Sequence, residues 1–131
     1  MSFKFGSCLI PNQHVFWQGT YSYALVNLRP IRPNHVLVCP MRLIHRYQDM
    51  QSHELQEIMQ VTAKISRELG GVTSIAIQDG KEAGQSVQHL HVHIVPRQSG
   101  KVFHVDSSSQ NRSQEEMALE AYRLKLNLNL D

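Results

Sequence analysis

The sequence predicts one α+β domain over residues 1–131, with about five antiparallel strands in one sheet and two main helices. Short runs of β-forming residues are separated by proline and glycine turns, which is typical of antiparallel strands. Two longer stretches, well apart in the chain, carry helical periodicity or a helix-capping pattern. A chain of 131 residues is also long enough to bury one hydrophobic core.

The first three strands are expected at residues 15–17, 21–27 and 35–40, all rich in apolar or aromatic residues. Residues 29–34 contain two prolines, which fix φ and remove backbone donors, so this stretch is expected to be a turn. The first part of the chain is therefore expected to form neighbouring strands joined by turns.

The clearest helix is expected at residues 52–71, where apolar residues recur at three- and four-residue spacing. Ser52 is the expected N-cap of this helix. A second helix is expected to start after Ser113, which forms a capping-box pattern with Glu116, and to run to about Leu126. The apolar stripe of the first helix is expected to pack against the sheet.

Two further strands, at residues 73–78 and 89–95, flank a loop at residues 79–88 that contains glycines. The polar stretch at residues 98–112 is expected to be a mobile loop before the last helix.

Three histidines alternate with apolar residues in the expected strand at residues 89–95. Side chains of a strand alternate between its faces, so His89, His91 and His93 are expected on one face, opposite apolar side chains. We interpret this row of imidazoles as a reaction surface.

A metal site is one alternative for the row. The outer two α-carbons would lie roughly 13 Å apart, so all three histidines cannot share one ion. Two could bind a metal with a third ligand such as His35, but no Asp, Glu or Cys pattern accompanies them. We therefore expect no metal site.

A second alternative is that the histidines lie on a solvated face of the sheet and have no function. Such a face would more naturally carry Thr, Lys or Glu.

Catalysis at phosphorus fits the row better, because neutral imidazole can attack a phosphoryl centre and form a covalent intermediate. The preceding loop supports this interpretation. Gly80 and Gly84 let backbone N–H groups approach an anion closely, and Gln85 and Ser86 could donate further hydrogen bonds. The loop is not a P-loop, because no Lys follows Gly84.

Composition excludes several classes of function. The net charge is +2, so no strong field for nucleic acid or a membrane surface is expected. No apolar run is long enough to span a bilayer. Cys8 and Cys39 match no zinc or redox spacing and are expected to be reduced. We expect an intracellular protein, located in the cytoplasm with the nucleus as a further compartment.

The segment at residues 89–95 matches His-x-His-x-His-x-x with apolar x and resembles the signature of the histidine triad family. Other segments, spread over nearly the whole chain, resemble its fragile histidine triad branch. They are residues 2–6, 24–27, 35–40, 78–87 and 112–118. That branch cleaves dinucleoside polyphosphates, chiefly diadenosine triphosphate, to AMP and ADP. The resemblance thus implies a hydrolase that forms a covalent AMP–histidine intermediate.

The resemblance also implies roles for individual residues. His91 would be the nucleophile, His93 would contact the α-phosphate and help the leaving group or the water, and His89 and His35 would orient the site. The residues implied to contact the substrate are Asn27, Gln78, Gly84, Gln85, Ser86, Val87, His93 and Cys8. Cys8 stands where well-known members often have a histidine, so that contact differs. Phe5, Leu25 and Leu37 are expected to form the floor of an adenine pocket.

The resemblance implies a homodimer that joins two five-stranded sheets into one. It implies no tightly bound cofactor; Mg²⁺ or Mn²⁺ is expected to accompany the substrate. Two other functions stay open. One is an adenosine phosphoramidase, although members of that branch usually have a tryptophan-containing C-terminus and this chain ends without one. The other is a nucleotide-binding signalling module whose output is the ligand-bound state.

Overall fold

The computed structural model describes residues 3–97 and 111–131. Its centre is a five-stranded antiparallel sheet with the strand order β3-β4-β5-β7-β6. The strands are β3 (Val15–Gln18), β4 (Ser22–Val26), β5 (Val36–Pro40), β6 (Thr73–Ile77) and β7 (Val92–Pro96). The predicted α+β class and the five-stranded antiparallel sheet are confirmed.

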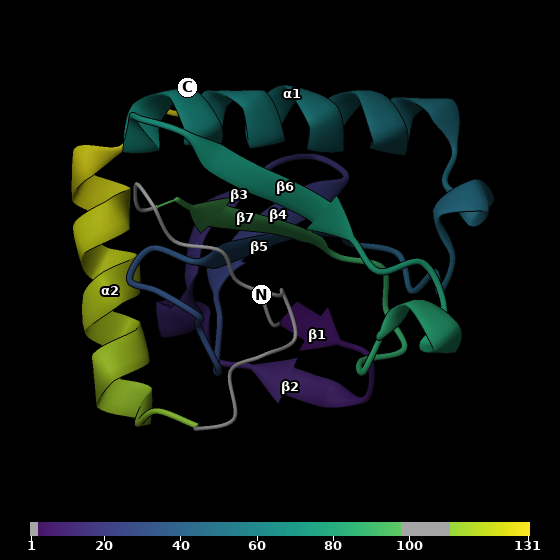
Figure 1. The fold of residues 1–131 in the computed structure, drawn as a ribbon, viewed down its shortest axis with the longest axis horizontal. Helices are drawn as coiled ribbons and strands as arrows, with labels where there is room; N and C mark the ends of the chain where they lie inside the picture. The colour runs from purple at the N-terminus through teal and green to yellow at the C-terminus, as the bar shows by residue number, and fades with distance from the viewer. Residues whose placement is uncertain (1–2, 98–110) are drawn as a thin grey trace.

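Two helices, α1 (Ser52–Leu69) and α2 (Gln114–Asn127), share one core with the sheet. Buried side chains of β4, β5 and β7 meet Ile58, Val61 and Ile65 of α1 and Met117 and Leu124 of α2 there. In Figure 1, α1 runs along the top of the view and α2 along its left side. One face of the sheet is therefore covered by helices.

The helix ends follow local rules, with one correction. The N-cap of α1 is Gln51 and not Ser52, and the backbone N–H of Gln51 donates to Glu54 Oε1 at 2.8 Å. A capping box joins the N-cap to the side chain three residues later. That side chain is Glu54 here, so Gln51 is the N-cap and Ser52 is the first helical residue. The predicted capping box of α2 is confirmed: the backbone N–H of Glu116 donates to Ser113 Oγ at 3.1 Å.

The opposite face of the sheet carries a hairpin that the sequence did not predict. Strands β1 (Phe3–Phe5) and β2 (Cys8–Ile10) pair antiparallel around Gly6, whose φ is 62°. The hairpin lies beside the sheet in Figure 1. Its aromatic residues join a second apolar cluster with Tyr23, Leu25, Leu37 and Cys39. The chain's N-terminal segment thus covers part of the face that the helices leave open.

Strand β7 begins later than predicted. It spans Val92–Pro96, so His89 and His91 precede the strand and Pro96 is its last residue. The pairing of β5 with β7 runs from Val36–Ile94 to Val38–Val92. Continuing this register would place Cys39 opposite His91 and Pro40 opposite Leu90, and Pro40 has no N–H to donate. Leu90 instead donates its N–H to Ile44 O at 2.7 Å.

Three short 3₁₀ turns connect the elements: η1 (Asn12–His14), η2 (Tyr47–Asp49) and η3 (Lys81–Ala83). The loop predicted over residues 98–112 lies mostly outside the described residues, which resume at position 111. None of the described helices has the length and apolar character needed to cross a membrane.

Candidate active site

The predicted row of histidines lies on the sheet face opposite the helices. His93 pairs with Leu37 in the β5–β7 ladder and shares its face, whereas Val92 and Ile94 point into the helical core. His89, His91 and His93 are all buried, and the ring centroids of His91 and His93 are 4.9 Å apart. Although only His93 lies in the strand, the alternation predicted from the sequence places these side chains correctly.

His89 is held by both of its ring nitrogens. The backbone N–H of Gly6, in the β1–β2 turn, donates to Nδ1 at 3.0 Å. Nδ1 must therefore be unprotonated, and Nε2 carries the proton that it donates to Pro40 O at 2.8 Å. With both nitrogens occupied, His89 joins the hairpin to the end of β5.

His91 is held through only one of its ring nitrogens. Its Nδ1 lies 2.7 Å from His89 O, and a carbonyl oxygen can only accept, so Nδ1 carries the proton. Nε2 consequently keeps its lone pair. The Phe5 ring packs edge-on against the imidazole at 4.9 Å between centroids. The ring is thus fixed in place with a nucleophilic nitrogen left over.

His35, directly before β5, sets the proton on His93. The N–H of Ile31 donates to His35 Nδ1 at 3.0 Å, so the His35 proton sits on Nε2. Nε2 lies 3.0 Å from His93 Nδ1 and donates to it. The proton of His93 is therefore on Nε2. That nitrogen is buried and has no hydrogen-bond partner among the residues that the structure describes.

Burial keeps all four imidazoles neutral. Loss of hydration is the main reason why the pKa of His35 falls to about 4 and that of His93 to about 3. The nearby His91 acts in the same direction on both, whereas the Glu120 carboxylate acts in the opposite direction on His35. Burial also lowers the pKa of His89 and His91, although their bonds to backbone carbonyls act in the opposite direction. At neutral pH the site presents a lone pair on His91 and an N–H on His93.

The glycine loop at residues 79–88, which follows β6, is held by the side chain of its own residue Gln85. Gly80 and Gly84 both have positive φ. The Gln85 side chain accepts from Gly80 N at 2.8 Å and donates to His45 O and Val87 O. The amide of Gln85, which the sequence predicts as a donor to phosphate, makes these three bonds to the protein backbone. Ser86, the next residue, is exposed.

Three other predicted contact residues are Asn27, Cys8 and Gln78. Asn27 Nδ2 lies 3.1 Å from His35 Nε2, but both nitrogens carry protons in this tautomer, so the contact is a close approach and not a hydrogen bond. Asn27 Oδ1 accepts from Arg29 N. Cys8 is exposed on β2, opposite Phe5 in the hairpin. Gln78 follows β6 and is half-buried.

Val87 packs against the second apolar cluster, which gathers the three residues expected to floor an adenine pocket, Phe5, Leu25 and Leu37. Sequence reasoning missed the hairpin. The alternation of Phe3, Lys4 and Phe5 was its one local signal.

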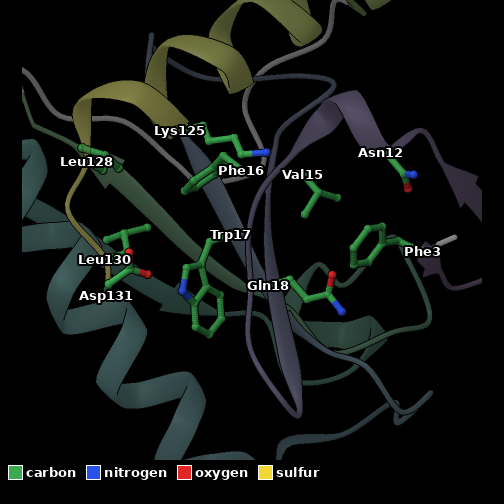
Figure 2. A pocket seen from close by; sticks show the side chains of 10 residues that line it. All are labelled: Phe3, Asn12, Val15, Phe16, Trp17, Gln18, Lys125, Leu128, Leu130 and Asp131. Carbon is green, nitrogen blue, oxygen red and sulfur yellow. The ribbon is translucent and has the colours of Figure 1, made fainter. Parts of the chain in front are cut away.

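A cavity of about 580 Å³ lies elsewhere, along the outer edge of β3. Figure 2 shows its lining, which combines β3 with the end of α2 and the residues after it. Strands β4 and β5 separate β3 from β7, and no histidine lines this cavity. Within the described part of the chain, no three His, Cys, Asp or Glu side chains form a cluster suited to a metal ion.

Comparison with known proteins agrees with these features. Residues 10–100 match the HIT domain family. The chain is 37% identical to a bis(5'-adenosyl)-triphosphatase of Dictyostelium discoideum over 92% of its own length and 89% of that protein. The crystal structure of the Caenorhabditis elegans NitFhit protein superposes with a TM-score of 0.87 at 36% identity, covering 97% of this chain but 30% of that one.

The structure of a Plasmodium falciparum diadenosine triphosphate hydrolase in complex with cyclomarin A has a TM-score of 0.77 at 34% identity. The alignment covers 95% of this chain and 82% of that one.

Proposed function

This chain belongs to the HIT domain family, and on that premise we propose that it hydrolyses dinucleoside polyphosphates, chiefly diadenosine triphosphate to AMP and ADP. The observation that carries the proposal is the pair of neighbouring imidazoles, one with an unprotonated ring nitrogen and the other with a ring N–H. His91 offers a lone pair and His93 offers an N–H. Attack on a phosphate needs both a nucleophile and a donor to the oxygens that gain charge.

In the first step, Nε2 of His91 attacks the α-phosphorus. The N–P bond forms as the P–O bond to the leaving ADP breaks. The His91 Nδ1–H bond to His89 O supports this step, because it holds the ring in line and stabilises the positive charge that develops on it. The N–H of His93 then lies where a non-bridging oxygen can accept it.

In the second step, water attacks the same phosphorus from the side that ADP has left. A new O–P bond forms, the N–P bond to His91 breaks, and AMP departs while one proton of the water passes to solvent. His91 regains its lone pair, so the cycle needs no added cofactor. His89 and His35 contribute by holding the two reacting imidazoles in their tautomers.

The surroundings offer the contacts that a dinucleotide needs. The apolar cluster of Phe5, Leu25 and Leu37 would take an adenine, and Asn27 the ribose beside it. The N–H groups of the glycine loop, with Ser86 and Gln78, would hold phosphate oxygens. Polyphosphate oxygens are ligands that Mg²⁺ and Mn²⁺ prefer, so we propose that the cation enters with the substrate.

Turnover of diadenosine triphosphate in ¹⁸O-labelled water tests this function. The expected products are ADP without label and AMP that carries it, because water enters at the phosphorus retained by AMP. Label in ADP would contradict attack at that phosphorus. An adenosine phosphoramidate assayed in parallel separates the phosphoramidase alternative, which predicts the faster rate with that substrate. A signalling module is favoured instead if neither substrate turns over while diadenosine triphosphate still binds.

A homodimer is part of the proposal, and the outer edge of β6 supports it. Ile75 of β6 is 51% exposed and Val72 before it is also exposed, and no strand of the described residues pairs with the outer edge of β6. The opposite edge, β3, is contacted by α2. Light scattering should give a dimer for the native chain and a monomer for Ile75→Lys. The control Leu119→Lys, at an exposed position of α2, should stay dimeric; a monomeric native chain would contradict the proposal.

A further inference from the structure

One ion pair, between Arg112 just before α2 and Glu120 within α2, holds both ends of the segment that carries Asn27 and His35. Arg112 and Glu120 are 14% and 7% exposed, and their side chains meet at 2.6 Å between Nη2 and Oε1. Buried charges of this kind need several hydrogen bonds to offset their lost hydration. The segment at residues 27–35 supplies those bonds, so the pair and the segment depend on each other.

Arg112 holds the first end of the segment. Its Nε donates to Asn27 O at 3.0 Å, and its backbone N–H donates to Leu28 O at 3.2 Å. Beside it, Arg29 Nε donates to Asn111 Oδ1 at 2.6 Å. The backbone from which the Asn27 amide projects toward His35 is therefore fixed by residues that adjoin α2.

Glu120 holds the second end. Its Oε2 accepts the N–H of Asn34 at 3.0 Å, and Arg123 Nη2 donates to Asn34 Oδ1 at 3.0 Å. Asn34 has φ of 67°, a left-handed conformation that costs free energy in any residue other than glycine. Asn34 directly precedes His35, so Glu120 stabilises the backbone turn that aims the His35 ring at His93.

We propose that Arg112 and Glu120 are positioning residues of the histidine site, acting through Asn27 and through the His35–His93 hydrogen bond. The inference rests on the proposed function for its kinetic consequence. Arg112 fixes the residue proposed to bind the ribose, and Glu120 fixes the residue that keeps the His93 proton on Nε2. Loss of Arg112 contacts should therefore weaken substrate binding, whereas loss of Glu120 contacts should slow the chemical step.

A matched control lies on the other helix. Glu54 of α1 is also buried, accepts two hydrogen bonds from Arg42 and accepts a backbone N–H from Gln51. It makes no hydrogen bond to the segment at residues 27–35 or to the three histidines in the described part of the chain. Glu120→Gln and Glu54→Gln thus remove equivalent charges, only one of which is joined to the site.

Kinetics with diadenosine triphosphate, well below the melting temperature of every variant, decide the proposal. Glu120→Gln should lower kcat roughly 10- to 100-fold with little change in KM, and Glu54→Gln should leave both within twofold. Equal losses in the two variants would show a purely structural role. If Glu120→Gln does not fold, Arg112→Lys replaces it, with Arg42→Lys as control; it should chiefly raise KM, and an unchanged KM would overturn the role of Arg112.

A spectroscopic readout keeps the inference separate from the proposed function. Long-range ¹H–¹⁵N NMR at pH 7 reports which nitrogen of each imidazole is protonated. The native chain and Glu54→Gln should show His93 protonated on Nε2 alone, whereas Glu120→Gln should show both tautomers. An unchanged His93 tautomer in Glu120→Gln would overturn the inference. Native chain that fails to cleave diadenosine triphosphate would instead count against the proposed function.

Discussion

The histidine site and the cavity along β3 differ in how their polar groups are held. At the histidine site, the imidazoles are buried and each has at least one ring nitrogen fixed by a hydrogen bond. The polar residues that line the cavity are all exposed: Asn12, Gln18, Lys125 and Asp131. The polar groups of the β3 cavity thus face solvent, whereas those of the histidine site are buried.

This difference indicates where the chemistry belongs. A group that is already oriented and dehydrated loses little free energy when it meets a transition state, whereas an exposed side chain must first be ordered. The buried Nε2 of His93, which has no partner among the described residues, costs roughly 1–3 kcal/mol of stability. A buried N–H without an acceptor is more readily tolerated at a site where a bound ligand can supply that acceptor.

Replacing His91 should have the largest effect. His91→Asn removes the nucleophilic Nε2, but its amide can still donate to His89 O, so the fold and substrate binding should persist. We expect kcat with diadenosine triphosphate to fall roughly 10⁴-fold or more. His89→Asn is the matched control, with a smaller loss because both nitrogens of His89 are used structurally. Turnover retained in His91→Asn would remove the basis for the nucleophile assignment.

His93→Asn should have the second largest effect. The variant loses the N–H proposed to stabilise charge on the phosphate oxygens, and removing one such donor typically costs about 10²–10³-fold in kcat. KM should change little, because the donor acts chiefly in the transition state. Steady-state kinetics separate the two parameters; a rise in KM at constant kcat would assign His93 to ground-state binding instead.

The face of the histidine row could be predicted from the sequence, because alternation along an extended chain is a local property. The capping box of α2 was predictable for the same reason: Ser113 and Glu116 are three residues apart. The start of β7 was not, since it depends on Pro40, which lies two residues beyond Val38, the last β5 residue that pairs with β7.

The difference between the three histidines could not be predicted from spacing either. The proton of His89 is set by Gly6, 83 residues earlier, and that of His93 by His35, 58 residues earlier. Asn34 and Glu120 are likewise 86 residues apart. Contacts of this kind form only when the hairpin, the segment at residues 27–35 and α2 converge, so no local pattern contains them. Resemblance to the histidine triad family had to supply the individual roles.

The buried histidines should also make stability depend on pH. His35 and His93 titrate near 6.5 in the unfolded chain, but their pKa values in the folded protein are about 4 and about 3. Below pH 6.5 these histidines therefore bind protons in the unfolded state but not in the folded state. The free energy of unfolding consequently falls as pH falls. Each group contributes up to about 1.4 kcal/mol per pH unit between pH 6.5 and its pKa in the folded protein, about 4 for His35 and about 3 for His93.

Urea unfolding at pH 7, 6 and 5 measures this dependence. The native chain should lose stability steadily over the range, and His93→Asn should lose it less steeply because one of the buried groups is gone. Equal slopes in the two proteins would mean that His93 is protonated, or exposed to water, in the folded state. The histidine site would then resemble the cavity at β3 more than the structure indicates.

Lys125→Ala should have the smallest effect and tests the other side of the comparison. Lys125 is exposed at the rim of the β3 cavity (Figure 2), so its removal should change the free energy of unfolding by no more than about 0.5 kcal/mol. Its charge is screened by solvent, and strands β4 and β5 lie between β3 and β7, so kcat/KM should stay within twofold. A tenfold loss would mean that the cavity takes part in substrate binding, because an exposed lysine has no other means of acting on buried imidazoles.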